Sequence, residues 1–440
     1  MLYPSVFIPD ESLFKKDNGE QDMDHYITKI YVEHVRHLKD IEIDLGEEKR
    51  THLILTGKNG SGKTSLLKAI KQNLSSINKG EWNKLSGEFQ RNVDNLSSRS
   101  SDLKLNESQR LEIENNLRFW QDRIDNARDG LALEFSKEDD LDARYQQGQF
   151  VTAFFAADRM TRIDEPHGVE DVKLQSTYTV EQDPVKDLMK YLVHLKTQQA
   201  YAQNERDTVI EKKIKKWLDG FEAAIRSLMD DGTISLEYDY RNYKFEIRQE
   251  GRKPYDFTQL SDGYSAAIRI VADLLMRMDQ NWLMNDTEPA LDTEGVVLID
   301  EIETHLHLEL QRTILPFLTK MFPRLQFIVT THSPFVVSSL DNAVIYDLED
   351  HILARDGLTN VSYSGVVEGY FRADELSEIM RKKFERYKAL IAKENLSDEE
   401  YAEIMDLEVY LDEIPDYLSI GIATEYSRLK LEFENRENKR

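Results

Sequence analysis

The sequence predicts an α/β fold in which parallel strands are covered by helices on both faces. Two nearly continuous apolar runs, "GVVLIDE" at 295–301 and "LQFIVTT" at 325–331, are typical of central strands that are buried on both sides. A third run, "THLILTG" at 51–57, leads into a glycine-rich loop and then into an apolar, helix-like stretch. Strand, loop and helix in this order indicate a site for phosphate groups.

The composition narrows the class of protein. The 440 residues are 40% apolar and 10% aromatic, which suffices for one large domain or two to three ordinary ones. The chain has no cysteine, so disulfides and thiolate metal sites are excluded. No apolar run approaches the roughly 20 residues that cross a bilayer, and the start, "MLYPSVFIPDESLFKKDNGE", lacks the layout of a signal peptide. We therefore expect a cytoplasmic protein with no membrane partner.

The charge of the chain bears on its partners. A net charge of −25 repels free nucleic acid, so any contact with DNA requires a local basic patch. Two candidates are "EKKIKKW" at 211–217 and "MRKKFERYK" at 380–388, although both are also typical of solvated helix faces. Between 394 and 416 the chain carries ten carboxylates and no lysine or arginine. This stretch is either a solvated helix face or a surface that docks a basic partner.

The first third of the chain predicts strands followed by helices. Short alternating runs in 24–57 predict two or three strands, and a helix is expected to begin near Lys63. Apolar residues then recur at helical spacing on both sides of the serine-rich break at 97–102. They predict a short antiparallel helical hairpin with arms of roughly 25 Å, and two ordinary packed helices are the alternative.

The rest of the chain alternates between the two kinds of element. A buried strand is expected at 150–158, helices at 185–229 and a β-hairpin at 233–249. Beyond Asp347 the pattern is helical, and Ser397 with Glu400 forms a capping box. The predicted parts are an N-terminal lobe at 1–79, a helical-hairpin insertion at 80–148, the remainder of the main domain at 149–350, and a helical C-terminal domain for partner docking at 351–440.

The glycine-rich loop fits the pattern G-x-x-x-x-G-K-[ST], known as Walker A. Glycines let backbone N–H groups turn inward around phosphates. Lys63 is expected to neutralise the β- and γ-phosphates of ATP, and Thr64 to supply a hydroxyl group to Mg²⁺. The residues expected to contact the nucleotide are Gly57, Asn59, Gly60, Ser61, Gly62, Lys63, Thr64 and Ser65.

Two further groups of polar residues follow apolar strands. Asp300 is placed to hold Mg²⁺, and Glu301 is placed to act as general base toward water. His332, at the tip of the next strand, is placed to contact the γ-phosphate. The segment "LSDGYSA" at 260–266 precedes a predicted helix, so Ser261 and Gly263 offer hydroxyl and N–H donors at an anion site, or else form an ordinary helix cap.

The chain resembles the head of ABC-type ATPases in their SMC and RecF branch. The resemblance covers about residues 26–347 and rests on the order of four motifs: the phosphate loop, the LSxG-type signature, the Asp-Glu after a strand, and Thr-His-Ser. It implies an ABC-type P-loop ATPase head, which is an α/β fold, with ATP and Mg²⁺ as cofactors. It also implies a homodimer or higher oligomer in which Ser261 and Gly263 act on the nucleotide held at Lys63 of a second copy.

A narrower resemblance lies in "LIDEIETHLHLELQRTILPFLTKMFPRLQFIVTTHSPFVVSSL". It is similar to ATPases of anti-phage islands, namely those of the Septu, PARIS and retron-associated systems, and to the ATPase half of the OLD nucleases. In that group ATP turnover or nucleotide-held assembly controls an effector nuclease, usually a separate toprim-like or HNH chain. Two positions depart from the pattern: Asp262 replaces the second signature glycine, and Leu308 replaces a proline. No Q-loop glutamine is assigned, although Arg159 lies near the expected place.

The expected function follows from these motifs and from what the sequence lacks. No toprim-like or HNH-like pattern appears, so we expect the chain to hold or license a separate nuclease and to release or activate it on phage infection, through a phage-derived trigger. A RecF-like DNA-binding repair ATPase is one alternative. A nucleotide-gated scaffold with slow turnover is another, and Asp262 favours it.

Overall fold

The computed structural model describes the larger part of the chain, in two compact units. Residues 1–360 form one unit and residues 361–440 the other. The described residues are 24–100, 107–138, 140–158, 164–278, 293–355, 357–359, 378–393, 396–412, 426, 428–431 and 433. Arg159 therefore lies outside the described residues.

A six-stranded sheet forms the centre of the first unit, with the strand order β12-β11-β3-β10-β9-β5. Strand β10 pairs in parallel with β3 and with β9, and β5 pairs in parallel with β9. The central strands are buried along their whole length, as their apolar runs predict. The bounds are β3 His52–Thr56, β5 Phe150–Phe155, β9 Glu294–Ile299, β10 Leu325–Thr330, β11 Ala343–Asp347 and β12 Ile352–Ala354.

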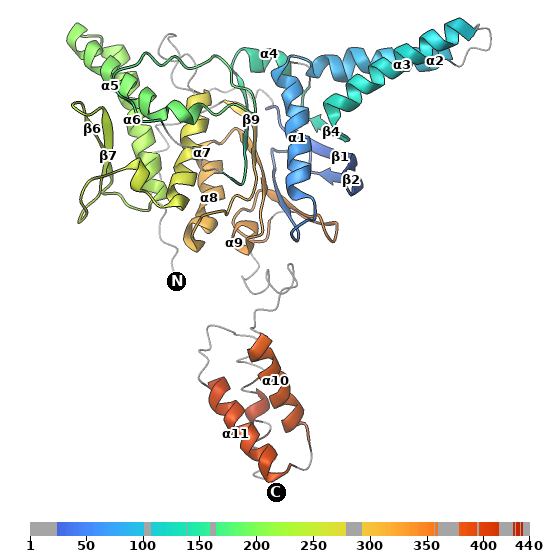
Figure 1. Ribbon diagram of the computed structural model, residues 1–440, viewed down its shortest axis with the longest axis vertical. Helices are drawn as coiled ribbons and strands as arrows, with labels where there is room; N and C mark the ends of the chain where they lie inside the picture. Colours follow the sequence, from blue (N-terminus) through green and yellow to red (C-terminus); the bar gives the residue numbers. More distant parts are fainter. Residues whose placement is uncertain are drawn as a thin grey trace. The chain divides into compact units, whose positions relative to one another are not determined.

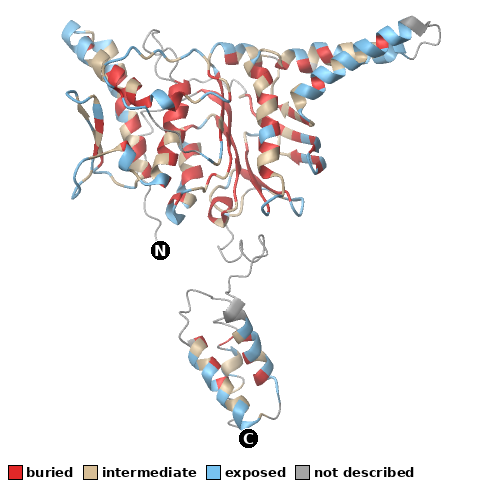
Figure 2. Cartoon of the chain, viewed as in Figure 1, coloured by how far each residue is buried: buried red, intermediate tan, exposed pale blue. Residues whose placement is uncertain are grey.

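Helices cover both faces of this sheet, which gives the predicted α/β fold (Figure 1). Helix α1 lies on one side of β9, and α7 and α8 lie on the other. The buried residues concentrate in the sheet and on the helix faces turned toward it (Figure 2). The bounds are α1 Lys63–Asn78, α7 Asp262–Met278 and α8 Leu308–Met321, with the short α9 at Pro334–Val337.

A small antiparallel sheet flanks α1, in the order β2-β1-β4. Strands β1 (Ile27–Val35) and β2 (Leu38–Asp44) fall in the stretch where two or three strands are predicted. Strand β4 (Leu131–Phe135) pairs with β1, and the short helix α4 (Leu141–Gln146) follows it. Both lie inside the range 80–148 that is predicted as a helical-hairpin insertion, so the hairpin helices end at Arg128 and the rest of the range belongs to β4 and α4.

The predicted helical hairpin is present and extends away from the sheet (Figure 1). It consists of the π-helical turn η2 (Lys84–Phe89), α2 (Gln90–Ser100) and α3 (Glu107–Arg128). Leu85, Phe89 and Ile124 form a small buried cluster near its base, with the ring of Phe89 4.9 Å from that of Trp120. None of the residues of α2, all of which are described, is buried, so this arm of the hairpin adds nothing to the buried core.

The middle of the first unit holds a second helical pair and a third sheet. Helices α5 (Leu188–Glu205) and α6 (Thr208–Leu228) occupy the range predicted as helical. Strands β6 (Ser235–Asp239) and β7 (Lys244–Arg248) form the predicted hairpin, and β8 (Tyr255–Asp256) adds an edge. Two short 3₁₀ turns, η3 (Pro184–Asp187) and η4 (Phe257–Gln259), connect these elements.

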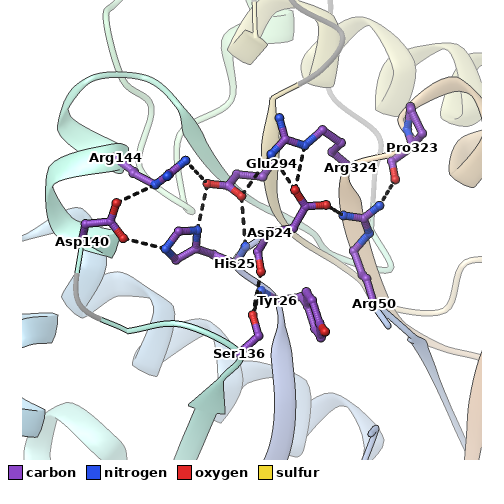
Figure 3. A network of polar contacts seen from close by, with 10 residues as sticks. All are labelled: Asp24, His25, Tyr26, Arg50, Ser136, Asp140, Arg144, Glu294, Pro323 and Arg324. Carbon is purple, nitrogen blue, oxygen red and sulfur yellow. Dashed lines mark hydrogen bonds and ion pairs between the residues drawn. The ribbon is translucent and has the colours of Figure 1, made fainter. Parts of the chain in front are cut away.

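A network of charged side chains joins the two main sheets at the first residue of β9 (Figure 3). His25 and Glu294 are each 1% exposed, and His25 Nδ1 lies 3.0 Å from Glu294 Oε1. His25 Nε2 lies 2.7 Å from Asp140 Oδ1. Burial alone lowers the pKa of His25, but hydrogen bonds and charges of these two carboxylates together raise it above its ordinary value. The network also contains Asp24, Arg50, Arg144 and Arg324.

The second unit has its own small core between α10 (Glu378–Ile391) and α11 (Asp398–Asp412). The predicted capping box is confirmed: Glu400 N–H donates to Ser397 Oγ at 3.2 Å, and Ser397 N–H donates to Glu400 Oε2 at 3.0 Å. Helical structure after Asp347 begins later than predicted, since β12 intervenes. Within the described part of the chain, no helix is long and apolar enough to span a membrane.

Candidate nucleotide-binding site

The loop between β3 and α1 has the backbone of a phosphate cradle. Gly57, Gly60 and Gly62 have φ angles of +131°, +86° and +101°, a region that side chains disfavour. A Cβ atom on Gly57 would lie 2.8 Å from Ser61 Oγ, so the loop is too tight for a larger residue. Ser61 N–H donates to the carbonyl of Lys58 at 3.1 Å, which closes the turn. Successive N–H groups in such a turn make a concave anion site.

Lys63 lies inside this loop and is 5% exposed. Its ammonium group donates to the carbonyls of Gly57 at 2.7 Å and Lys58 at 3.0 Å. Burial lowers the pKa of Lys63, and the charges of Glu301 and Glu303 act in the opposite direction. A buried cation held by neutral carbonyls and faced by carboxylates is well placed to bind a phosphate.

Thr64 and Asp300 meet at the end of β9. Thr64 Oγ1 donates to Asp300 Oδ1 at 3.1 Å, and Thr330 Oγ1 donates to the same oxygen at 2.7 Å. The backbone N–H of Asp300 donates to the carbonyl of Phe155 on β5, at 2.8 Å. Hydroxyl and carboxylate oxygens are ligands that Mg²⁺ prefers, together with water and phosphate oxygens, so this pair fits the predicted Mg²⁺ site.

Glu301 stands on a bend directly after Asp300. Its φ angle is +46°, which is uncommon for a residue with a side chain and turns the backbone out of the strand direction. Its N–H donates to Thr330 Oγ1 at 2.7 Å, and its Oε2 accepts from Thr304 Oγ1 at 3.2 Å. The carboxylate is thus held beside the Asp300 site, where a general base for water is predicted.

His332 and Glu303 connect the next strand to this bend. The backbone N–H of His332 donates to Glu303 Oε1 at 2.5 Å. Burial lowers the pKa of His332, the charge of Lys63 lowers it further, and Glu303 and Glu301 oppose both effects. The sequence prediction did not include Glu303, whose signal was a third acid in "DEIE" at 300–303.

The signature segment begins α7. Ser261 and Asp262 are exposed, while Gly263 is buried. A Cβ atom on Gly263 would lie 2.6 Å from the carbonyl oxygen of His305, so this glycine permits a close contact within its own chain. Asp262 is the first residue of α7, where a negative charge stabilises the helix dipole. The predicted action of Ser261 and Gly263 on a second copy stays a prediction.

His307 lies beside the signature helix. Its Nδ1 accepts the N–H of Leu310 at 3.1 Å and so caps α8, and its Nε2 lies 3.2 Å from the hydroxyl group of Tyr264. Leu308, which stands where the related pattern has proline, is the first residue of α8 and is 59% exposed. The segment after Glu301 is thereby linked to the signature segment inside one chain.

A cavity of about 490 Å³ adjoins the phosphate loop. The turn between β1 and β2 contributes His37 and Leu38, and His37 Nε2 lies 3.1 Å from the carbonyl of Ser61. On the other side, Lys58 Nζ lies 2.6 Å from Glu349 Oε1. No local sequence pattern points to this cavity, because its walls come from segments about 300 residues apart.

The structure thus brings Lys63, Thr64, Asp300, Glu301 and His332 to one edge of the sheet. All five follow the carboxyl ends of β3, β9 and β10, where ligands bind in open α/β sheets. Their roles toward nucleotide and Mg²⁺ stay predictions.

Comparison with families of known proteins gives a match over most of the chain. A family described as "AAA domain, putative AbiEii toxin, Type IV TA system" matches residues 53–338. This range contains the phosphate loop, the signature segment, the carboxylates after β9 and His332.

Several curated proteins are similar to the chain. Septu protein PtuA of Bacillus mycoides (strain KBAB4) is 25% identical over 442 residues, which cover 94% of this chain and 53% of that protein. The Retron Ec83 probable ATPase of Escherichia coli is 35% identical over 147 residues, which cover 32% of this chain and 27% of the relative. The chain therefore spans about half the length of the first of these relatives and less of the second. Among solved structures, the SMC head domain from Thermotoga maritima is 13% identical with a TM-score of 0.34, over 73% of this chain and 94% of that one.

Proposed function

Because the chain belongs to the family described as "AAA domain, putative AbiEii toxin, Type IV TA system", we propose that it binds and hydrolyses ATP in an anti-phage defence system. The predicted resemblance to the ATPases of Septu and retron systems is confirmed by the relatives. The observation that carries the proposal is the convergence of Lys63, Thr64, Asp300 and Glu301 at one sheet edge.

The proposed reaction assigns each side chain one task. On binding, Lys63 leaves the carbonyls of Gly57 and Lys58 for the phosphates, which offer a charged acceptor instead of neutral ones. Glu301 takes the proton of the attacking water, and His332 faces the terminal phosphate. Thr64 and Asp300 hold Mg²⁺, which when bound neutralises charge on the phosphate oxygens. The adjoining cavity beside His37 is proposed to take the sugar and base.

We propose that two copies at least close over shared nucleotides. Ser261 is exposed at the start of α7 and is therefore open to a second copy. The exposed Asp262 beside it adds a negative charge close to the proposed phosphate contact. This repulsion supports slow turnover, and it keeps the nucleotide-gated scaffold as a second candidate function.

The proposed partner is a separate effector nuclease that the ATPase holds or licenses. This proposal is supported by the names of two similar proteins, which refer to Septu and to a retron. The second unit offers a docking face on α11: Met405 and Val409 are 68% and 62% exposed, and the carboxylates Asp398, Glu399 and Asp406 of the same helix are exposed too. An apolar stripe with an acidic margin suits a basic protein surface.

The docking face has a direct test. The chain is co-expressed with the protein encoded next to it, and the pair is purified through a tag on one partner. Changing Met405 and Val409 to aspartate is expected to abolish co-purification, because the change adds charge to the apolar stripe. The matching change at Tyr201 and Val209, which are 58% and 57% exposed on the first unit, is the control. Equal loss in both variants would contradict this docking face.

A DNA-binding repair function has less support. In the second unit Arg386 forms an ion pair with Glu403 at 2.8 Å, and Lys383 Nζ lies 3.3 Å from the centre of the Tyr410 ring. In α6 the neighbours Ile214 and Trp217 are buried, so the lysines between them line an ordinary amphipathic helix. Arg386 and Lys383 are therefore engaged within the second unit, and the exposed Lys212 and Lys215 form the polar face expected of such a helix.

The proposed activity is tested by measuring ATP binding and phosphate release. Lys63→Ala is expected to weaken ATP binding, and Glu301→Gln to preserve binding while slowing hydrolysis by about 100-fold or more, as for loss of a general base. Glu33→Gln, an exposed carboxylate on β1, serves as the matched control. Wild-type binding and hydrolysis in both site variants would refute the assignment. Mass measurement with and without ATP then separates a hydrolase from a scaffold.

A further inference from the structure

Glu303 is a carboxylate in the proposed ATPase site to which the proposed reaction assigns no task. One of its oxygens, Oε1, accepts the backbone N–H of His332 at 2.5 Å. The other oxygen, Oε2, is buried and has no hydrogen-bond partner among the described residues. Buried polar atoms nearly always have a partner, so one without a partner points to a group that arrives later.

The surroundings of Glu303 show which group this is. Its Oε1 accepts the N–H of His332, the residue proposed to face the terminal phosphate, and its charge opposes the lowering of the pKa of both His332 and Lys63. Its own backbone carbonyl accepts the N–H of Leu306 at 2.9 Å, which fixes the turn that carries it. The acceptor is therefore held on a fixed turn that also contacts His332, the residue proposed to face the terminal phosphate. The nucleotide phosphates offer acceptors only, and the Ser261 hydroxyl group of a second copy is proposed to contact the phosphates. The attacking water is therefore the donor that the reaction itself brings to this oxygen.

We propose that Glu303 is a positioning residue for hydrolysis, and that its free oxygen accepts a hydrogen bond from the attacking water. The inference rests on the proposed ATPase function. Water has two hydrogens: one passes to Glu301 as the water oxygen bonds to the terminal phosphorus and the bond to ADP breaks. The second hydrogen stays on the water oxygen, and Glu303 orients it. The hydrogen bond from the N–H of His332 to Oε1 holds the segment after β9 and the segment after β10 together during this step.

The rival explanation is purely structural, and Glu303→Gln separates the two. The amide oxygen of glutamine still accepts the N–H of His332, but its NH₂ group replaces the free acceptor with a donor. If Glu303 orients water, kcat falls by about tenfold or more, while KM and the Kd for ATP change by less than about threefold. If Glu303 is only a tether, Glu303→Gln keeps the wild-type kcat and only Glu303→Ala is impaired, and the proposal is overturned.

The same assay includes Glu303→Asp, Glu301→Gln, Lys63→Ala and the exposed Glu33→Gln. Aspartate keeps the negative acceptor at shorter reach, so it is expected to recover part of the activity that glutamine loses. No recovery would contradict the proposal even if Glu303→Gln were poorly folded, as judged by its melting temperature. If Lys63→Ala and Glu301→Gln abolish turnover while Glu303→Gln does not, this inference alone fails. If none of the variants matters, the proposed function itself fails.

Discussion

Gly263 illustrates how a motif residue serves the fold of its own chain. In the second position of α7 an alanine would ordinarily stabilise a helix by about 1 kcal/mol relative to glycine. Here its Cβ would lie 2.6 Å from the carbonyl of His305, a backbone atom that has little room to move. Steric strain therefore outweighs helix propensity at this position.

Gly263→Ala is expected to lower the free energy of unfolding by about 1–3 kcal/mol, the usual cost of overpacking. The measurement is chemical denaturation followed by circular dichroism. Gly220→Ala in α6 is the matched control, because a Cβ there meets nothing within 4 Å. The control should gain about 1 kcal/mol from helix propensity. Equal effects in the two variants would show that the contact with His305 does not constrain the signature.

His52 is a buried residue whose protonation limits stability in acid. Its Nδ1 accepts the N–H of Phe327 at 3.0 Å, and burial, aided by the charge of Arg50, lowers its pKa from 6.5 to about 3. The unfolded chain takes up a proton below pH 6.5 while the folded chain does not, so stability is lost as pH falls from about 6.5 toward 3. At pH 5 the loss amounts to about 2 kcal/mol.

The variant His52→Asn keeps an acceptor for Phe327 but cannot titrate. Its free energy of unfolding, followed from pH 7 to pH 4, is expected to decline less steeply than that of the wild type. The exposed His167→Asn should follow the wild-type slope. Parallel slopes for all three proteins would rule out His52 as the source of acid sensitivity.

Which site residues the sequence predicts depends on how local their signal is. Lys63, Thr64, Asp300 and Glu301 sit in short motifs that directly follow predicted strands, and the parallel pairing of these strands brings them to one sheet edge. Glu303 follows the same strand as a third acid, but no motif gives it a role, because its contact with His332 depends on the neighbouring loop. The cavity beside His37 is formed by segments near residues 37, 58 and 349, so no local sequence pattern can predict it.

At the scale of elements, the strongest periodic runs are predicted well and the short ones are not. Strands β9 and β10 and helix α1 have long apolar runs or a motif at their ends. Strand β4 has only five residues and follows directly on α3. Its alternation of apolar and polar residues is too short to be told apart from the helical pattern before it. Gly130, directly before β4, allows the close approach to β1, because a Cβ atom there would collide with the carbonyl oxygen of His34.

The capping box of α11 gives an element-scale prediction. Ser397→Ala removes the oxygen that accepts the N–H of Glu400, which is expected to destabilise α11 by about 1 kcal/mol. Hydrogen exchange of the amides in the first turn of α11 should be faster in the variant. Ser98→Ala, within α2, is the control and should gain about 0.5 kcal/mol from helix propensity. Unchanged exchange at α11 would show that the cap does not hold the helix.

At the scale of the whole molecule, the chain consists of two units with separate cores. The core of the second unit contains Phe384, Tyr387 and Leu407, none of which belongs to the core of the first. The sequence predicts this division near 351, and the structure places it at 360 because β12 pairs with β11 and extends the sheet. The short strand β12 is not predicted from the sequence, so the start of the helical pattern places the boundary between the units too early.

Separate cores predict separate unfolding. Calorimetry of the full chain is expected to show two transitions, and a chain ending at residue 360 should keep one of them. Because the proposed nucleotide site lies wholly in the first unit, the shortened chain should bind ATP with nearly wild-type Kd. A single shared transition, or loss of ATP binding on shortening, would show that the units depend on each other.

Strand β9 has a charged residue fixed at each end. Glu294 begins it inside the ion-pair network of Figure 3, and Asp300 follows it directly at the nucleotide site. Sliding the strand by one position would move its residues by about 3.3 Å and exchange the two faces of the sheet. Glu294 would then lose its ion pairs with His25, Arg144 and Arg324. A buried carboxylate without such partners is strongly destabilising. The ion pairs of Glu294 thus fix the register of β9, and this register determines the positions of Asp300 and Glu301 at the opposite end of the strand.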